Sequence, residues 1–230
     1  MKCVRRICIW CRNIILFCVA FSVATVIVCK YVPIRYTPLM FVRLCKQGDR
    51  IQRHWVPLEQ ISRSMVEAVI ASEDNLFMQH HGFDLKQIDK ALEDARRGRR
   101  LRGASTISQQ TAKNVFLWPA RSYFRKALEA YFTLLIECIW GKERIMEVYL
   151  NSVETGAGLY GVEVAARTYF GKQAGELTRE ESALIAAILP DPRRRNPVRP
   201  TNYLRGRQRQ ILSLMRKLEP VHMGCRSGEK

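Results

Sequence analysis

The chain has 230 residues, of which 47% are hydrophobic and 26% charged, and its formal net charge is +17 at pH 7. This length accommodates one domain with short appendages rather than two catalytic modules. The apolar content is too high for a disordered chain, and 13 glycines and 9 prolines are too few for a collagenous or low-complexity sequence. A charge this positive favours a polyanionic partner, which composition leaves open among nucleic acid, anionic lipid and a phosphate-bearing substrate.

An apolar segment near the N-terminus predicts a membrane anchor. Residues 14–29 carry no charge, and the stretch from Ile7 to Cys29 is long enough to cross a hydrocarbon layer of about 30 Å as a helix. Basic residues precede it, which places the N-terminus in the cytoplasm. No small-x-small cleavage site follows, so we expect an uncleaved single-pass anchor rather than a removed signal peptide. The alternative is a buried core helix. With an anchor, the remaining chain lies outside the cytoplasm, which disfavours a nucleic-acid partner.

Apolar periodicity predicts a mainly α-helical domain. We divide the chain into a cytoplasmic stub with the anchor (1–30), a membrane-proximal linker (31–57), the main domain (58–218) and a tail (219–230). Helical spacing recurs at residues 61–72, 85–95, 121–140, 143–150, 161–169, 178–190 and 203–218. Thr178 and Glu181 form a capping box at the start of one helix, which Pro190 ends. A strand pattern is found only around residues 35–44.

Cysteine spacing predicts neither a disulfide framework nor a metal site. Five of the eight cysteines lie in or beside the apolar segment, where they act as small apolar residues or as acylation sites. The other three, Cys45, Cys138 and Cys225, are far apart in the sequence and are structural or incidental.

Two stretches carry more polar groups than a helical fold requires. In residues 72–84, Glu73 and Asp74 are adjacent and diverge by about 100° on a helix, so one can enter a cleft while the other braces the local structure. A capping and turn cluster explains this stretch equally well. Residues 103–114 are dense in hydroxyls and amides and include Lys113, which suits recognition of a sugar or phosphate. A solvated helix start is the alternative.

Two shorter stretches add charge and a turn. Arg125, Lys126 and Glu129 lie near one helix face, where such a group is ordinarily a surface salt bridge. The rest of that helix is apolar, which favours a cleft-lining position. The fourth stretch, Tyr149 to Asn151 followed by three glycines, has the pattern of a helix end and a loop.

Taken in order, these stretches resemble the motifs of the family 51 glycosyltransferases, which polymerise peptidoglycan. The matching residues of the first four motifs are Glu73, Asp74, Phe77, His80, Gly82 and Asp84; Gly103, Ser105, Thr106, Ile107, Gln109, Gln110, Lys113 and Asn114; Arg125, Lys126 and Glu129; and Tyr149 to Asn151, continuing into residues 169–172. A fifth motif resembles residues 183–190 and 196–197. Ala104 and Ser108 replace a common glycine and threonine, and neither touches a proposed catalytic group.

The resemblance is to a monofunctional member. Only about thirty residues follow the fifth motif, and no S-x-x-K nucleophile followed by K-T-G is present, so we expect no transpeptidase domain. The implied fold is a lysozyme-like helical glycosyltransferase domain. The implied reaction joins lipid II units: the 4-hydroxyl of one lipid II attacks the anomeric carbon of the growing glycan chain, undecaprenyl diphosphate leaves, and a β-1,4 bond forms by inversion without an enzyme nucleophile.

The resemblance also implies roles for the residues. Glu73 is the expected general base, and Lys113, Arg125 and Lys126 neutralise the diphosphate. Glu129, the second catalytic acid, either orients Arg125 or Lys126 or holds a divalent cation, Mg or Mn. No organic cofactor is expected, and metal ligands stay open. The other expected substrate-binding or site-shaping residues are Asp74, Phe77, His80, Ser105, Thr106, Gln109, Gln110, Asn114 and Asn151.

The expected location is the inner (plasma) membrane, with the catalytic domain periplasmic or extracytoplasmic. Expected partners are lipid II, the growing glycan chain, membrane lipids, and other cell-wall synthesis or division proteins, without nucleic acid. The basic runs 96–102 and 193–199 either contact anionic headgroups or are solvated, and residues 39–42 are expected to enter the bilayer.

Three alternatives remain from sequence alone. They are a lytic enzyme of the lysozyme superfamily, which cleaves glycans with a single catalytic Glu; a membrane-anchored scaffold without chemistry; and an RNA-binding protein, whose affinity would fall steeply with salt.

Overall fold

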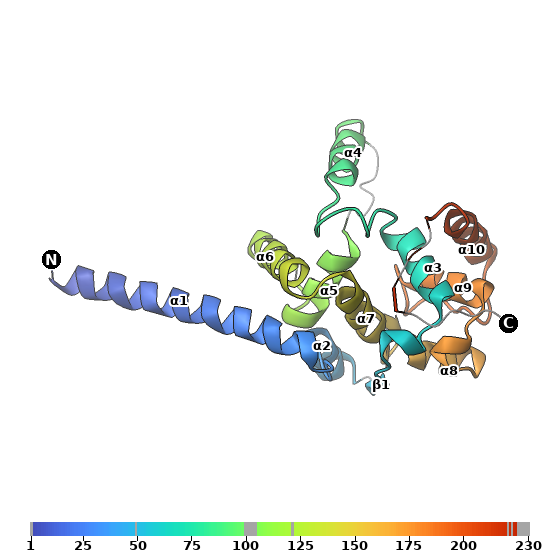
Figure 1. The fold of residues 1–230 in the computed structure, drawn as a ribbon, viewed down its shortest axis with the longest axis horizontal. Coiled ribbons are helices and arrows are strands. Elements are labelled where there is room, and N and C mark those ends of the chain that lie inside the picture. Colours follow the sequence, from blue (N-terminus) through green and yellow to red (C-terminus); the bar gives the residue numbers. More distant parts are fainter. Residues whose placement is uncertain are drawn as a thin grey trace.

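The computed structural model describes residues 2–48, 50–98, 105–120, 122–219, 221 and 223–224; the side chains of residues 2–4, 47, 88, 90–92 and 95 are not described. A long N-terminal helix projects from a domain built of shorter helices (Figure 1). The helices are α1 (Lys2–Tyr31), α2 (Pro38–Gln47), α3 (Arg63–Glu73), α4 (Leu85–Arg96), α5 (Ile107–Phe116), α6 (Tyr123–Ile139), α7 (Lys142–Ser152), α8 (Val162–Phe170), α9 (Arg179–Ile188) and α10 (Asn202–Met215). The mainly α-helical class is confirmed.

The core lies where two groups of helices meet. Helix α5 packs on α6 and α7, and α3 packs on α9 and α10. Fully buried residues of these helices include Met65, Ile107, Ile136, Ile145 and Ile185. Burial of each large aliphatic side chain contributes about 1.5–3 kcal/mol of transfer free energy. This packing fixes the helices relative to one another, together with the polar residues that they carry.

The core extends beyond the predicted boundaries of the main domain. Val56, from the expected linker, is buried, and so are Val221 and Met223, from the expected tail. The backbone N–H of Gly224 also donates to Glu143 Oε1 over 3.3 Å. Both segments therefore contribute to the folded domain in this structure.

A small sheet links the segment after α2 to the loop after α7. Strand β3 (Leu159–Tyr160) pairs in parallel with β1 (Gln52–Arg53) and antiparallel with β2 (Glu154–Gly156), in the order β1-β3-β2. Periodicity did not predict these strands because two or three residues are too few to show alternation.

The strand expected at residues 35–44 is wrong, since this segment forms α2. Thr37 caps the helix by accepting a hydrogen bond from the backbone N–H of Met40, Pro38 occupies its first turn, and Gly48 ends it at φ +65°. These are helix start and stop signals, and they outweigh the β propensity of the tyrosine and valine residues nearby.

Helix α1 rests on the domain only through its last third. Trp140 Nε1 donates to Val26 O over 2.7 Å, and Ser22 Oγ and Tyr131 OH lie 2.7 Å apart. Arg144 donates to Cys29 O and Val32 O over 2.8 and 2.7 Å. The segment from Arg5 to Tyr31 is long and apolar enough to cross a membrane, and only 6% of its most apolar window is buried. A buried core helix, the alternative interpretation, is therefore wrong.

Candidate active site

Glu73 ends α3 and faces a cavity of about 850 Å³, here called the Glu73 cavity. Gln110 Nε2 donates to Glu73 Oε2 over 2.9 Å, and Tyr149 OH donates to Gln110 Oε1 over 3.4 Å. Because Tyr149 engages the amide oxygen, the amide NH₂ is the group that faces Glu73. The carboxylate is thus held in place from α5, which is in turn braced from α7. Ser105, which is exposed, and Gln110 both line this cavity.

Asp74 points away from this cavity and is 2% exposed. His80 Nε2 donates to its carboxylate at 2.9 and 3.0 Å, and the backbone N–H of Ile107 donates to Oδ2 over 3.0 Å. His80 Nδ1 accepts from the backbone N–H of Gly82 over 3.1 Å, so the ring proton is assigned to Nε2. The two adjacent acids divide as expected: Glu73 enters the cavity, and Asp74 braces the start of α5.

Several expected substrate-binding residues serve the fold instead. Phe77 is fully buried, and Lys142 Nζ lies 4.6 Å from its ring centroid. Asp74 and His80 are hydrogen-bonded to each other. Thr106 and Gln109 form a capping box at the start of α5, and Thr106 Oγ1 also donates to Gly82 O over 2.6 Å. These five side chains are engaged by other parts of the protein, which favours site shaping over direct substrate contact.

Asn151 is likewise engaged by the protein's own backbone. It is 6% exposed; its Oδ1 accepts from the backbone N–H of Val56 over 2.9 Å, and its Nδ2 donates to Val56 O and Glu147 O, both over 2.8 Å. Both amide hydrogens are used, so Asn151 joins α7 to the segment before α3. Gly161, in the loop between β3 and α8, packs against the same residue, since a Cβ there would lie 2.9 Å from Asn151 O.

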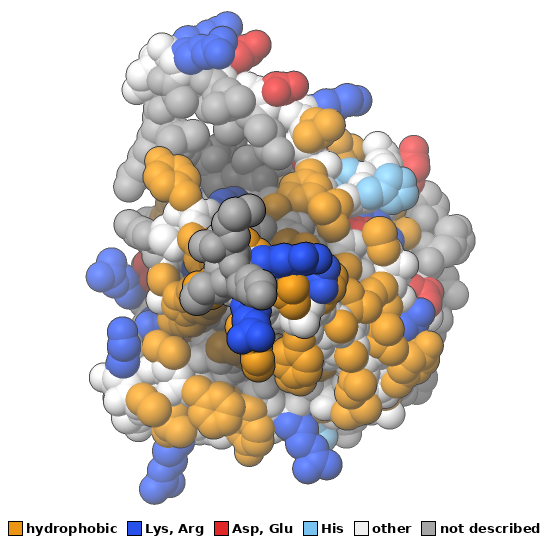
Figure 2. Space-filling view, turned by 90° about the vertical axis from the view of Figure 1, so that its left-hand side faces the viewer, with side chains coloured by type: hydrophobic (Ala, Val, Ile, Leu, Met, Phe, Trp, Pro, Cys, Tyr) orange, Lys and Arg blue, Asp and Glu red, His pale blue; other side chains and the backbone are white. Residues whose placement is uncertain are grey.

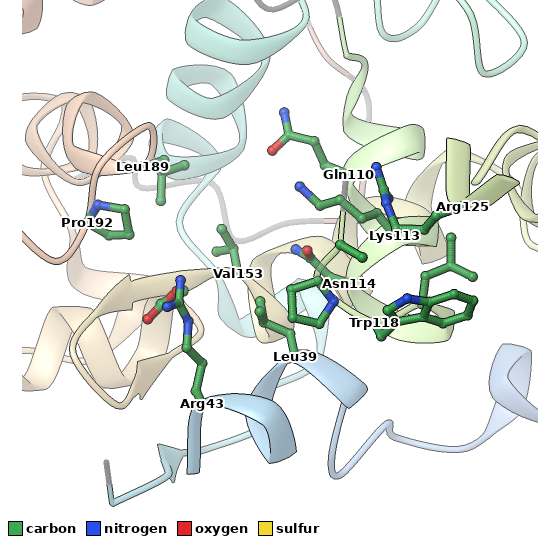
Figure 3. A pocket seen from close by; sticks show the side chains of 14 residues that line it. Leu39, Arg43, Gln110, Lys113, Asn114, Trp118, Arg125, Val153, Leu189 and Pro192 are labelled. Atoms are coloured by element: carbon green, nitrogen blue, oxygen red, sulfur yellow. The ribbon is translucent and has the colours of Figure 1, made fainter. Parts of the chain in front are cut away.

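A cationic cavity of about 610 Å³ lies on the other side of Gln110, which lines both cavities. Lys113 and Asn114 from α5 and Arg125 from α6 reach into it on one side, and Arg43 from α2 stands across from them (Figure 3). Arg125 Nη1 donates to Glu129 Oε2 over 2.8 Å, and Lys126 Nζ donates to Glu129 Oε1. Glu129 is 2% exposed, so it presents its two cations rather than its own carboxylate to a ligand.

Electrostatics link the two cavities. Burial raises the pKa of Glu73, while the hydrogen bond from Gln110 and the charges of Arg207 and Lys113 oppose that rise. Burial lowers the pKa of Lys113, while Glu129 and Glu73 oppose that fall. The Lys113 ammonium group therefore interacts with the carboxylates of both Glu73 and Glu129. A carboxyl group with a raised pKa beside a cluster of cations can accept a proton while an anionic group leaves.

The donor set does not fit a resident divalent cation. Both Glu129 oxygens are engaged by cations, and Glu73 accepts from Gln110. Among the residues that the structure describes, no three His, Cys, Asp or Glu side chains are grouped closely enough to hold a metal ion.

Comparison with known proteins places this geometry in a family. The family model described as Transglycosylase matches residues 42–216. The chain belongs to the transglycosylase family. It is 49% identical over 226 residues to the biosynthetic peptidoglycan transglycosylase of Bacteroides thetaiotaomicron, covering 95% of this chain and 91% of the relative. The corresponding proteins of Rhodospirillum centenum and Shewanella oneidensis are 52% identical over 189 residues (82% of each chain) and 43% identical over 227 residues (96% of each chain).

The region matched by the transglycosylase family includes all the residues proposed for the site, and also residues that sequence reasoning missed. Arg43, Trp118 and Glu154 line the cationic cavity, and Arg195, Tyr203 and Arg207 line the Glu73 cavity. Arg195 belongs to the basic run 193–199. The others lie in α2, β2, α10 and the loop after α5, outside the dense polar stretches, so no local pattern marked them as site residues. Gly103 of the second motif lies outside the described residues.

Two arginines of the basic run 193–199 contact the protein itself. Arg193 donates to Glu154 over 2.9 Å, and Arg195 donates to Ala187 O over 2.8 Å and stacks on Tyr203. The other basic run, 96–102, lies mostly outside the described residues; within it, Arg97 forms an exposed pair with Glu93.

Proposed function

We propose that this chain polymerises lipid II into β-1,4 glycan strands by inverting displacement of undecaprenyl diphosphate. As a member of the transglycosylase family it is a peptidoglycan glycosyltransferase of cell-wall synthesis. The observation that supports the finer statement is the adjacency of two cavities at Gln110. One contains the half-buried carboxyl group of Glu73, and the other contains Lys113 and Arg125, with Lys126 on the adjoining turn.

Glu73 supplies the base. The acceptor 4-hydroxyl oxygen forms a bond to the donor anomeric carbon as its proton passes to the Glu73 carboxylate, and the bond from that carbon to the diphosphate oxygen breaks. Proton transfer to a positioned base contributes about 10²–10⁴-fold when the pKa of the base lies near the working pH. Burial moves the pKa of Glu73 in that direction, and Gln110 fixes the geometry.

The cationic cavity stabilises the leaving group. Charge builds up on the diphosphate as its bond to the sugar breaks, and fixed cations in a partly buried cavity stabilise that charge without reorganisation. Glu129 holds Arg125 and Lys126 in place, and Asn114 adds an amide. In this proposal Glu129 is an orienting residue and does not transfer a proton.

A polymerisation assay tests the proposal. Detergent-purified full chain should lengthen lipid II into glycan strands, whereas Glu73→Gln should lose about 10²–10⁴-fold in rate while still binding lipid II. A normal rate in the variant would contradict the base assignment. Shortening of preformed peptidoglycan by the wild-type chain would instead indicate a lytic enzyme, and absence of any turnover would indicate a scaffold.

We also propose that α1 is a single-pass anchor with a cytoplasmic N-terminus and that the domain enters the outer part of the bilayer. Hydrophobic side chains gather on the face from which α1 projects (Figure 2). Helix α6, which packs on α1, exposes Tyr123 and Phe124 at 97% and 68%. Helix α1 rises about 13 Å between Ser22, which contacts Tyr131 of α6, and Tyr31. If the bilayer surface lay at Tyr31, the part of α6 around Tyr131 would therefore lie within the membrane.

Of residues 39–42, which were expected to enter the bilayer, two face the protein. Met40 is buried in the protein and Leu39 lines the cationic cavity, while Phe41 is exposed and packs against Tyr36 with a centroid distance of 5.6 Å. Helix α2 thus forms one wall of the cationic cavity and presents Phe41 outward. A lipid-linked diphosphate can be taken up here without its tail leaving the bilayer.

A further inference from the structure

Helix α10 brings a charged residue to the Glu73 cavity that none of the polar stretches contains. Arg207 lines the cavity together with Glu73. Its Nη2 donates to Ser72 O over 3.2 Å, and its Nη1 donates to Gln210 Oε1 over 2.8 Å. Ser72 directly precedes Glu73, so Arg207 contacts the last turn of α3 at the residue next to the proposed base.

The backbone that carries Arg207 is rigidly placed. Leu204, Ile211 and Met215 bury one face of α10, which packs on both α9 and α3. Thr201 caps the helix by accepting from the backbone N–H of Leu204. Because the helix is anchored on both sides of Arg207, the guanidinium stays at the end of α3 without help from a ligand.

We propose that Arg207 is a positioning residue for the general base: it ties the last turn of α3 to α10 and holds a guanidinium charge beside the Glu73 carboxylate. This inference rests on the proposed function, since it concerns the base of that reaction. It adds a residue from the C-terminal helix to a site otherwise built from α3, α5, α6 and α7.

Charged groups from several elements surround Glu73. Arg195 also lines the cavity, where it donates to Ala187 O and stacks on Tyr203. Asp74, its neighbour in the chain, favours the protonated form of Glu73, whereas Lys113 from α5 and Arg207 from α10 favour the carboxylate, Arg207 more strongly. Tyr149 from α7 is fully buried, which raises its pKa, so it faces Glu73 as a neutral phenol. Gln110 contributes only a hydrogen bond.

Substrate binding increases the importance of Arg207. In the proposed reaction Lys113 faces the diphosphate, whose negative charge offsets that of the lysine. Of the two cations that favour the Glu73 carboxylate, only Arg207 then lies in the Glu73 cavity rather than in the cationic cavity. Arg207 is thus the group that keeps the base deprotonated when the diphosphate is in place.

The test is the pH dependence of lipid II polymerisation by full-length Arg207→Gln and Arg207→Lys, with Arg209→Gln as the matched control. Arg209 is an exposed residue of the same helix, and its substitution removes the same charge. We expect the acidic limb of the kcat profile of R207Q, which reports the base in the substrate complex, to move to higher pH, with about a tenfold loss at the acidic end that shrinks as the pH rises. R207K should restore most of the limb, and R209Q should match wild type.

Each other outcome overturns the inference. A uniform loss at all pH values in R207Q, with a lowered Tm, would make Arg207 merely structural. A raised KM with an unmoved acidic limb would make it a substrate-binding residue. Failure of the wild-type chain to polymerise lipid II would instead refute the proposed function, so the two failures are distinguishable.

Discussion

At Glu73, function and stability oppose each other. Burial raises the pKa of this carboxyl group, so the folded state binds a proton there more tightly than the unfolded state does. The stability associated with this group is therefore fully present below the unfolded pKa of about 4.3 and is lost as the pH rises through the higher folded value. A carboxylate suited to accept a proton from a sugar hydroxyl thus lowers the free energy of unfolding at neutral pH.

We therefore expect Glu73→Gln, which lacks this titration, to be more stable than the wild-type chain at pH 7.5 and equally stable near pH 4. The gain should be a few degrees, because about 1 kcal/mol moves Tm by ~2–4 °C in a chain of this size. Thermal unfolding of both proteins across this pH range measures it. A wild-type chain that is the more stable of the two at neutral pH would show that Glu73 is not destabilised by burial.

The relative positions of side chains were predictable where the residues are close together in the sequence. Adjacent positions on a helix must diverge, which separated Glu73 from Asp74, and the spacing of Arg125, Lys126 and Glu129 brought them to one face as the structure shows. The position of Asn151 was not predictable, because its partner Val56 lies 95 residues away in the sequence. No local pattern states whether a polar side chain meets a ligand or a distant backbone.

At the scale of elements, the start of α5 is set by the loop that precedes α4. Gly82 at φ +92° donates its N–H to His80 Nδ1 and accepts at its carbonyl from Thr106 Oγ1, so it connects the first motif to the second. A Cβ at this position would lie 2.8 Å from Thr133 Cγ2 on α6. Both the backbone conformation and the packing therefore require glycine here.

We expect Gly82→Ala to cost about 2–4 kcal/mol of unfolding free energy, from the left-handed conformation and the contact with Thr133 together. Gly171→Ala is the matched control, since Gly171 has φ +65° and a methyl group added there would have no atom within 4 Å. It should cost only about 1–2 kcal/mol. Chemical denaturation compares the two, and equal losses would show that α6 does not restrict this loop.

Long elements with strong periodicity were the predictable ones. The stripe at residues 121–140 became α6, the capping box at Thr178 and Glu181 opens α9, and Asp84 caps the start of α4 through the backbone N–H of Gln87. The short strands were missed because two or three residues are too few to show alternation, and α2 was missed because its capping residues, not a repeating apolar face, mark it as a helix.

At the scale of the whole molecule, the cavities depend on segments that meet only in the folded chain. Helix α10 closes the Glu73 cavity and α2 closes the cationic cavity, although both lie outside the dense polar stretches. A local sequence pattern can identify reactive residues on a single element. The other residues that line a cavity come from distant segments, which are brought together only by packing. The order of the motifs indicated the reaction, but it could not indicate Arg43 or Arg207.

In the proposed membrane arrangement, the contact between α1 and α6 would set how deep the domain sits in the bilayer, and this depth is testable. We expect Phe124→Glu to slow polymerisation of lipid II in liposomes at least about fivefold, because an acidic side chain within the membrane costs about 2–3 kcal/mol. Leu85→Glu is the control: Leu85 is equally exposed but lies on α4, which projects apart from α1 (Figure 1). Both variants should match wild type in detergent. A normal rate of polymerisation by F124E in liposomes would place Phe124 outside the bilayer. The part of α1 that contacts α6 would then also lie outside the membrane.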